Sequence, residues 1–322
     1  MSAGSILTVL GPLDPARLGA CQAHEHLFVR EGPATRRVPE LLLDRYDATL
    51  EELRSYRAAG GEALVDAQPV GSGRMAELQV RASRESGVSV VAVTGFHRPF
   101  FYEPDHWIHE APLDHLVRLF CEELRNGMFL DGEAAWPVRQ GTTRAGLIKT
   151  AAGPEGLTGR WRTLFEAAAL ASRETGAPVM VHTEGGQGGP EIVRFFMERG
   201  VPADWLILCH LDRISGNADQ LCDIASTGAW LGLDTIGRFK YHDDAVEAAL
   251  VGRLLEAGHG GRILLGLDTT RARMRAYGGS IGLDYLWTQF LPFLRQCGIG
   301  DAAVRRMLFD NPARAFRRRV PP

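Results

Sequence analysis

Short apolar runs recur along the chain, and segments with helical periodicity separate them. The runs lie near residues 20–23, 62–66, 89–94, 145–150, 178–182, 206–210, 229–233 and 263–267. Uninterrupted apolar runs of this length are typical of parallel strands that are buried on both faces. The intervening segments predict helices, of which the clearest cover residues 45–59, 73–86, 113–126, 160–175 and 189–199. Eight strands that alternate with helices predict an α/β fold of the (β/α)8 type, the TIM barrel.

The alternation continues through the whole chain without a linker or a change in composition. We therefore expect one domain that spans residues 1–322. Two segments are longer than the usual connection from a strand to a helix. Residues 95–113 are rich in aromatic side chains and histidine, and residues 269–285 contain several arginines. Long loops at the carboxyl end of a barrel are where substrate recognition is expected.

Polar residues with metal-binding or catalytic chemistry stand near the ends of five of the predicted strands. They are His24, His26, Lys149, His182, His210 and Asp268. Catalytic residues of TIM barrels lie at the carboxyl ends of the strands, so the pattern predicts that these six share one site. Because side chains alternate along a strand, His24 and His26 should face the barrel interior together while Glu25 faces away.

Each of these residues alone also has an ordinary structural interpretation. A His-x-His pair arises by chance, a strand-end histidine can serve as a cap, Lys149 can reach the barrel mouth, and Asp268 can cap the next helix. Their joint placement favours a metal centre instead, since neutral imidazoles and carboxylates suit Zn2+ as well as Mn2+ and Co2+.

Two such ions would hold a hydroxide at neutral pH and polarise a carbonyl or phosphoryl oxygen. Lys149 would contribute as a carbamate formed with CO2, because an unmodified ammonium would repel the metal ions. Asp268 would bind one ion, orient the hydroxide and carry its proton toward the leaving group.

Composition narrows the class of protein further. A formal net charge of -3 gives no electrostatic case for nucleic-acid binding. No apolar run is long enough to span a membrane, and the first residues do not resemble a signal peptide. Five scattered cysteines indicate reduced thiols. We expect a cytoplasmic enzyme that acts on a small molecule.

Several motifs across the chain resemble the phosphotriesterase family of the amidohydrolase superfamily. They are TVLGPLDPARLG, HEHL, RAGLIKTA, PVMVHTEGG, CHLDR, GLDTTR and DNPARAF. The resemblance implies a homodimer with two divalent metal ions, most simply Zn2+, in each chain. It assigns His24, His26 and Asp268 to a buried ion and His182 and His210 to a more exposed ion. A carboxylated Lys149 and a hydroxide would bridge the two.

The family contains phosphotriesterases, lactonases for acyl-homoserine or simple lactones, and lactonases for phosphorylated sugar lactones. The segments TGFHRPFFYEPDHW, TIGRFKYHDD and GLDTTRARMRAYGGSIGLDYL are most similar to the third group. This similarity implies that Lys240 and Arg271 bind a phosphate. Met274 stands where that group has a tyrosine that contacts the phosphate. Arg275 and Tyr277 lie close by in the sequence and are the candidates to make this contact instead.

The sequence therefore predicts a metal-dependent hydrolase that opens a lactone ring by attack of a metal-bridging hydroxide, with a phosphorylated sugar lactone as the candidate substrate. A phosphotriesterase or carboxylester hydrolase on the same metal site is the alternative. A barrel that keeps the fold for binding alone is a third interpretation, which the complete ligand set opposes.

Overall fold

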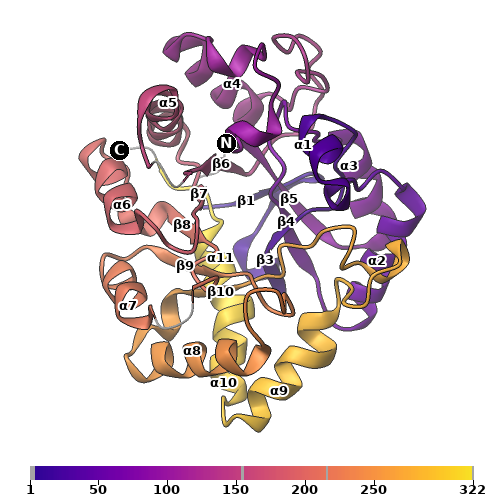
Figure 1. Ribbon diagram of the computed structural model, residues 1–322, viewed down its shortest axis with the longest axis vertical. Coiled ribbons are helices and arrows are strands. Elements are labelled where there is room, and N and C mark those ends of the chain that lie inside the picture. The colour runs from indigo at the N-terminus through magenta and orange to yellow at the C-terminus, as the bar shows by residue number, and fades with distance from the viewer. Residues whose placement is uncertain (1–3, 154–155, 215–216, 321–322) are drawn as a thin grey trace.

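A barrel of eight parallel strands forms the centre of the computed structural model, which describes residues 4–153, 156–214 and 217–320 (Figure 1). The strands follow one another in chain order, and each pairs in parallel with the next. They are β3 (Cys21–Glu25), β4 (Ala63–Asp66), β5 (Ser89–Gly95), β6 (Leu147–Ala151), β7 (Val179–His182), β8 (Leu206–Cys209), β9 (Trp230–Leu233) and β10 (Ile263–Leu265). The predicted TIM barrel is confirmed, and every predicted strand is present.

The last and first strands meet through hydrogen bonds just beyond β10. The backbone nitrogen of Asp268 donates to the carbonyl of His24 at 3.0 Å. The carboxylate of Glu25 is fully buried and accepts from Leu267 N at 2.8 Å and from Thr269 Oγ1 at 2.7 Å. Glu25, which alternation places opposite its two histidine neighbours, thus joins the two edges of the barrel.

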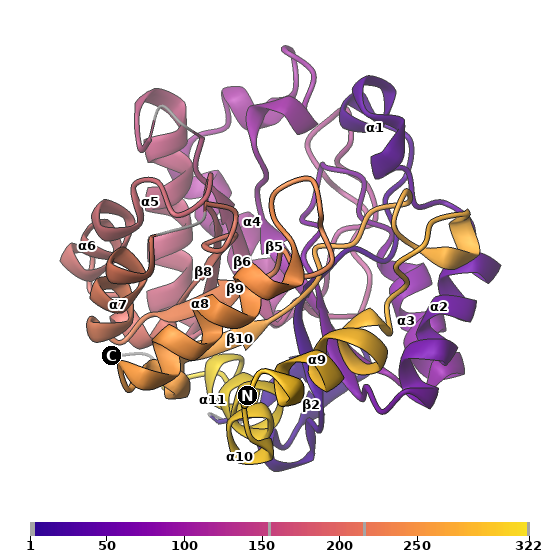
Figure 2. The ribbon, with the colours of Figure 1, turned by 60° about the horizontal axis from the view of Figure 1, so that its bottom comes forward.

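Helices surround the barrel. The five helices predicted from periodicity are present as α2 (Tyr46–Ala58), α3 (Ala76–Ser86), α4 (Leu113–Arg125), α5 (Gly159–Thr175) and α6 (Gly189–Glu198). The ring continues with α7 (Ala218–Ser226), α8 (Asp244–Glu256) and α9 (Leu291–Gln296). Figure 2 shows α1 (Pro33–Arg37) at one end of the molecule, and α10 (Asp301–Arg305) and α11 (Asn311–Ala315) at the other. No described helix is long and apolar enough to cross a membrane.

A short antiparallel hairpin that the hydrophobic pattern did not reveal precedes the barrel. It consists of β1 (Ile6–Thr8) and β2 (Gly11–Leu13). Val9 N donates to the carbonyl of Val90 at 2.8 Å, which places the hairpin at the amino end of β5. The hairpin covers the amino end of the barrel, so the carboxyl end is left for a functional site.

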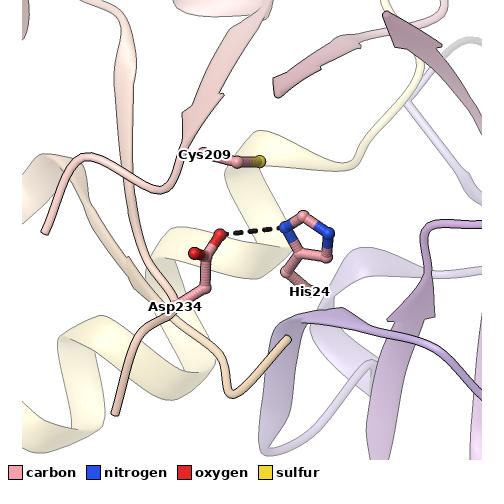
Figure 3. Close-up of side chains that lie close together, drawn as sticks. All are labelled: His24, Cys209 and Asp234. Carbon is pink, nitrogen blue, oxygen red and sulfur yellow. Dashed lines mark hydrogen bonds and ion pairs between the residues drawn. The ribbon is translucent and has the colours of Figure 1, made fainter. Parts of the chain in front are cut away.

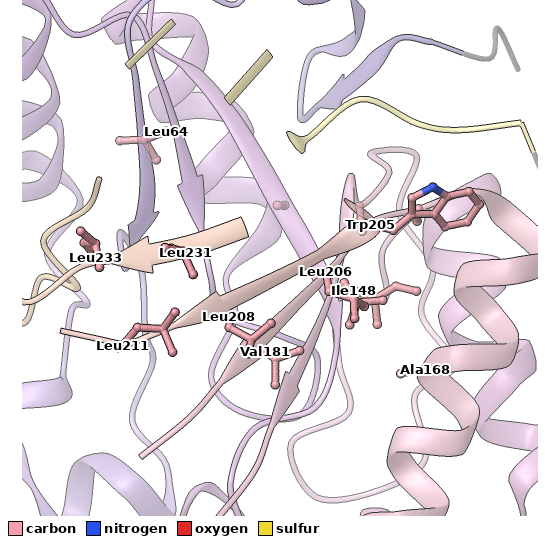
Figure 4. Close-up of a cluster of buried hydrophobic side chains, with 14 of the residues drawn as sticks. Leu64, Ile148, Ala168, Val181, Trp205, Leu206, Leu208, Leu211, Leu231 and Leu233 are labelled. Carbon is pink, nitrogen blue, oxygen red and sulfur yellow. The ribbon is translucent and has the colours of Figure 1, made fainter. Parts of the chain in front are cut away.

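Side-chain alternation divides the buried residues into two layers. One layer packs between strands and helices and includes Ile148, Val181 and Leu208, as Figure 4 shows. The other fills the barrel interior and includes Leu147 and Met180. Alternation along β6 and β7 places Lys149 on the same side as Leu147, and His182 on the same side as Met180. Both side chains therefore belong to the barrel interior.

Candidate metal centre

The histidines predicted to bind metal converge at the carboxyl end of the barrel. The ring centroids of His24 and His26 lie 5.6 Å apart, and those of His24 and His210 lie 4.8 Å apart. The His182 ring is 4.4 Å from that of His210. Three different strands therefore bring four imidazoles to one place.

The other two predicted residues lie within the same cluster. Lys149 Nζ is 3.2 Å from His24 Nε2. Asp268 Oδ1 is 3.3 Å from His26 Nε2 and 3.8 Å from His24 Nε2. The structure thus brings all six predicted residues together, although they are scattered over most of the chain.

Two of these residues have an unusual backbone. Among the described residues, His210 (φ 64°) and Asp268 (φ 48°) are the non-glycine residues with positive φ. This left-handed conformation is disfavoured for residues with a Cβ atom, and it is concentrated at functional sites. His210 directly follows β8, and Asp268 stands three residues beyond the end of β10, so the change in backbone direction occurs where the side chains enter the cluster.

The Lys149 side chain is completely buried, and its position depends on a glycine. Burial lowers the pKa of its amino group. Gly95 at the end of β5 has φ 101°, and a Cβ atom there would lie 1.9 Å from the carbonyl oxygen of Lys149. Only glycine therefore allows β5 to approach β6 closely at the lysine.

Three imidazoles of the cluster, those of His24, His182 and His210, are neutral at physiological pH. Burial, with the charge of Lys149, lowers the pKa of His24 to about 4, and burial lowers that of His182 to about 3. Burial and the charge of Arg213 hold the pKa of His210 well below its ordinary value. Ring nitrogens with free lone pairs beside a carboxylate form a donor set that suits a divalent cation. The residues present therefore fit a metal ion, and His24, His210 and Asp268 offer ligand atoms within 4.8 Å of one another.

Asp234, which directly follows β9, orients two of the histidines. Its buried carboxylate lies 2.9 Å from His24 Nδ1 and 2.5 Å from His210 Nδ1, and Figure 3 shows the contact with His24. Burial alone would raise the pKa of Asp234, but the two imidazoles lower it. Since both rings donate from Nδ1, each keeps Nε2 for a metal ion, as is usual for carboxylate–histidine pairs.

Cys209 also lies close to His24 and Asp234 (Figure 3). Burial raises the pKa of its thiol well above the ordinary value, so the sulfur stays protonated and is a poor ligand. The Asp234 carboxylate is already engaged by two imidazoles. This second group is therefore a weaker metal site than the group that contains Asp268.

A cavity of about 300 Å³ opens over the cluster. Phe100 and Phe101 from the long segment 95–113 form part of its wall, together with Val38 and Leu41. The cations that line it are Arg98, Arg213, Arg238 and Lys240. The cavity is therefore apolar on one side and strongly basic on another.

Two of these arginines hold the carboxylate of Asp268. Arg213 Nη2 lies 2.7 Å from Oδ2, and Arg238 Nη1 contacts the same oxygen. Burial would raise the pKa of Asp268, but Arg238, His210 and Arg213 together hold it well below its ordinary value. The carboxylate is therefore ionised at neutral pH.

The residues predicted to bind substrate do not all reach this cavity. Lys240 lines it, whereas Arg271, Arg275 and Tyr277 are not among its lining residues. The Arg275 guanidinium contacts the Asp284 carboxylate, and the Tyr277 hydroxyl lies 2.9 Å from Thr49 Oγ1. The Arg271 guanidinium lies over the Tyr277 ring at 5.7 Å. Tyr277 thus joins the segment 269–285 to α2, whereas Arg271 and Arg275 contact residues of the segment itself.

The sequence analysis assigns no ligand-binding or catalytic role to Asp234, Arg213 or Arg238. Asp234 follows a strand directly, so the rule that selected the other ligands would also have found it. Arg213 and Arg238 lie within the motifs CHLDR and TIGRFKYHDD. Position after a strand was the available signal for both.

Comparison with known proteins agrees with this geometry. A family model described as "Phosphotriesterase family" matches residues 4–316. A phospho-furanose lactonase from Mycoplasmopsis synoviae is 29% identical over 319 residues, which cover 96% of this chain and 90% of the relative. The crystal structure of a lactonase from Listeria monocytogenes superposes with a TM-score of 0.90 at 26% identity and covers 98% of this chain and 100% of that one. The Escherichia coli phosphotriesterase homology protein, crystallised with phosphate in its active site, has a TM-score of 0.85 at 29% identity, with 95% and 100% coverage.

Proposed function

Because this chain belongs to the phosphotriesterase family and is a metal-dependent hydrolase, we propose that it opens the ring of a lactone that carries a phosphate. The observation that carries the proposal is the basic side of the cavity, where Arg98, Arg213 and Arg238 already contact carboxylates of the protein and Lys240 does not. Within the described parts of the chain, Lys240 has no carboxylate at salt-bridge distance. An anionic group on the substrate would give this ammonium its partner.

We propose that the centre holds two divalent cations, most simply Zn2+, with Mn2+ and Co2+ as alternatives. His24, His26 and Asp268 would hold one, and His182 and His210 would hold the other. Once bound, the pair would activate water for attack and polarise the lactone carbonyl.

A carboxylated Lys149 would stand between the two cations. Burial lowers the pKa of its amino group, which increases the neutral fraction that can react with CO2. The resulting carbamate is an anion, so it would replace a repulsive positive charge with a bridging ligand.

The protein side chains would then move the proton and orient the substrate. Asp268 would take the proton of the attacking water and pass it to the alkoxide that leaves as the ring opens. Lys240 would bind the phosphate and fix the distance between it and the carbonyl. Phe100 and Phe101 would exclude water from the apolar side of the cavity.

Paired lactones with and without a terminal phosphate test the proposal, with a neutral phosphotriester as a third substrate. Loss of one charge-assisted contact costs roughly 1.5–3 kcal/mol, so Lys240→Ala should lower kcat/KM for the phosphorylated lactone by more than about tenfold. The same variant should leave the neutral lactone almost unaffected, and Lys240→Arg should retain activity. Equal losses on both lactones, or a native preference for the neutral substrate, would contradict phosphate recognition.

The phosphotriesterase or carboxylester alternative uses the same metal ligands. A neutral triester or ester would leave the Lys240 ammonium without a counter-charge, so this side of the cavity does not favour it.

We also propose that the protein acts as a cytoplasmic homodimer, which rests on the family resemblance. Light scattering of the purified protein tests the dimer.

A further inference from the structure

Glu184 links the metal cluster to the wall of the cavity. It stands two residues after His182, and its Oε1 lies 3.0 Å from His182 Nε2. The same oxygen also accepts a hydrogen bond from Arg98 Nη1. One carboxylate therefore joins a candidate metal ligand on β7 to the segment that follows β5.

This hydrogen bond determines which nitrogen of His182 can bind a cation. Donation from Nε2 to Glu184 leaves the lone pair on Nδ1. His24 and His210 have the opposite arrangement, because both donate from Nδ1 to Asp234. His182 thus needs its own carboxylate partner, and Asp234 cannot serve all three rings.

Arg98 is held in place by the fold of its own segment. Its backbone nitrogen donates to His97 Nδ1 at 2.8 Å, and His97 N donates to the Tyr102 hydroxyl at 2.7 Å. The His97 ring stacks on Phe101 with centroids 3.6 Å apart. The guanidinium is therefore presented to Glu184 from a packed turn rather than from a free loop.

We propose that Glu184 is a positioning residue that orients His182 for metal binding, and that Arg98 holds Glu184 in place. The inference rests on the proposed role of His182 as a metal ligand. An ordinary ion pair at the surface would add only slightly to the free energy of unfolding and would not affect metal affinity. A positioning role instead predicts an effect on metal affinity that is larger than any effect on stability, because partners of metal ligands tune affinity strongly.

The test measures metal transfer from the holoenzyme to a chelator, together with the number of metal ions per chain. Glu184→Ala should weaken retention of one ion by about 10–100-fold, the usual range for such partners. Glu184→Gln should lose less, since its amide oxygen can still accept from His182 Nε2. Arg98→Ala should weaken retention less than Glu184→Ala, and adding Arg98→Ala to Glu184→Ala should cause no further loss.

The ion pair between Arg125 and Glu174, with 2.6 Å between Nη1 and Oε1, provides a matched control on α4 and α5. Glu174→Ala should leave metal retention unchanged. If Glu184→Ala retains both ions as tightly as the native protein, the positioning role is excluded. His182→Asn separates this outcome from failure of the proposed centre. Loss of an ion in His182→Asn alone would reject only the role of Glu184, whereas retention of both ions would reject the proposed ligand set.

Discussion

At the scale of single residues, His210 and Asp268 combine an unfavourable backbone with the chemistry of the site. A positive φ costs a residue with a Cβ atom on the order of 1–3 kcal/mol unless its surroundings fix it. Here they do: His210 N donates to Asp234 Oδ2 at 3.3 Å, and Asp268 N donates to the His24 carbonyl. The hydrogen bonds that stabilise this conformation therefore involve other members of the metal cluster.

Replacement of Asp268 by asparagine separates the backbone from the charge, because asparagine tolerates positive φ as well as aspartate does. We expect Asp268→Asn to fold normally and to lose at least about two decades in kcat, the scale of a general acid–base group. The measurement is kcat at saturating lactone, with the metal content of each preparation determined. A near-native kcat at full metal content would remove Asp268 from proton transfer.

The buried imidazoles predict how the stability of the metal-free protein depends on pH. The pKa of His24 is lowered to about 4 and that of His182 to about 3, whereas both rings titrate at their ordinary value of about 6.5 in the unfolded chain. Between the lowered and the ordinary pKa values, the unfolded chain therefore binds more protons than the folded protein. The contribution of these two rings to the free energy of unfolding is fully present above about pH 6.5 and falls as the pH drops.

Each such group can contribute up to about 1.4 kcal/mol per pH unit within this window. Denaturant unfolding at several pH values between 4 and 7 should show the decline, and His182→Asn should reduce its slope. A slope that is the same in both proteins would show that the ring of His182 is not buried as a neutral base.

At the scale of secondary structure, hydrophobic runs predicted the strands well because each is buried on both faces. The hairpin of β1 and β2 escaped prediction because it is short, and Gly11–Leu13 has no apolar run. The arginines of segment 269–285 predict a place beside the substrate, but long-range contacts determine the path of this segment. The buried Glu52 on α2 accepts from Ala276 N at 2.7 Å and from Leu283 N at 2.9 Å.

The contact between β5 and β6 predicts a strong effect of Gly95→Ala. The added Cβ would meet the Lys149 carbonyl and would also require a positive φ, so the two effects should cost about 3 kcal/mol or more together. Gly87 is a suitable control, because it has φ 71° but no atom within 4 Å of an added Cβ. Gly87→Ala should therefore cost only about 1 kcal/mol. Equal unfolding free energies for the two variants would contradict the close approach.

At the scale of the whole molecule, the site could be predicted because one rule of topology applies to all of it. The carboxyl ends of parallel strands meet, so six scattered residues could be assigned a common location before any distance was known. The partners of those residues were harder to predict. Glu184 and Arg98 act through mutual hydrogen bonds, and a single sequence contains no pattern for such pairs.

The same topology predicts that metal removal weakens the barrel as a unit. The proposed ligands come from β3, β6 and β7 and from the residues after β8 and β10, so bound cations would tie most of the barrel together. Cations at 1,000 times their dissociation constant would stabilise the folded state by about 4 kcal/mol per site. The hydrophobic layer between the strands and the helices is formed by apolar residues and includes none of the proposed metal ligands. The metal-free protein should therefore remain folded.

Calorimetry of the native and chelator-treated protein measures this difference. We expect a single unfolding transition that moves to lower temperature after chelation and recovers when Zn2+ is added back. Recovery of activity should be faster with bicarbonate present, because Lys149 must be carboxylated again before both ions are held. The variant Lys149→Met should show a smaller shift on chelation and no effect of bicarbonate. An unchanged transition after complete metal removal would mean that the cations do not join the strands, and a bicarbonate-independent recovery would argue against the carbamate.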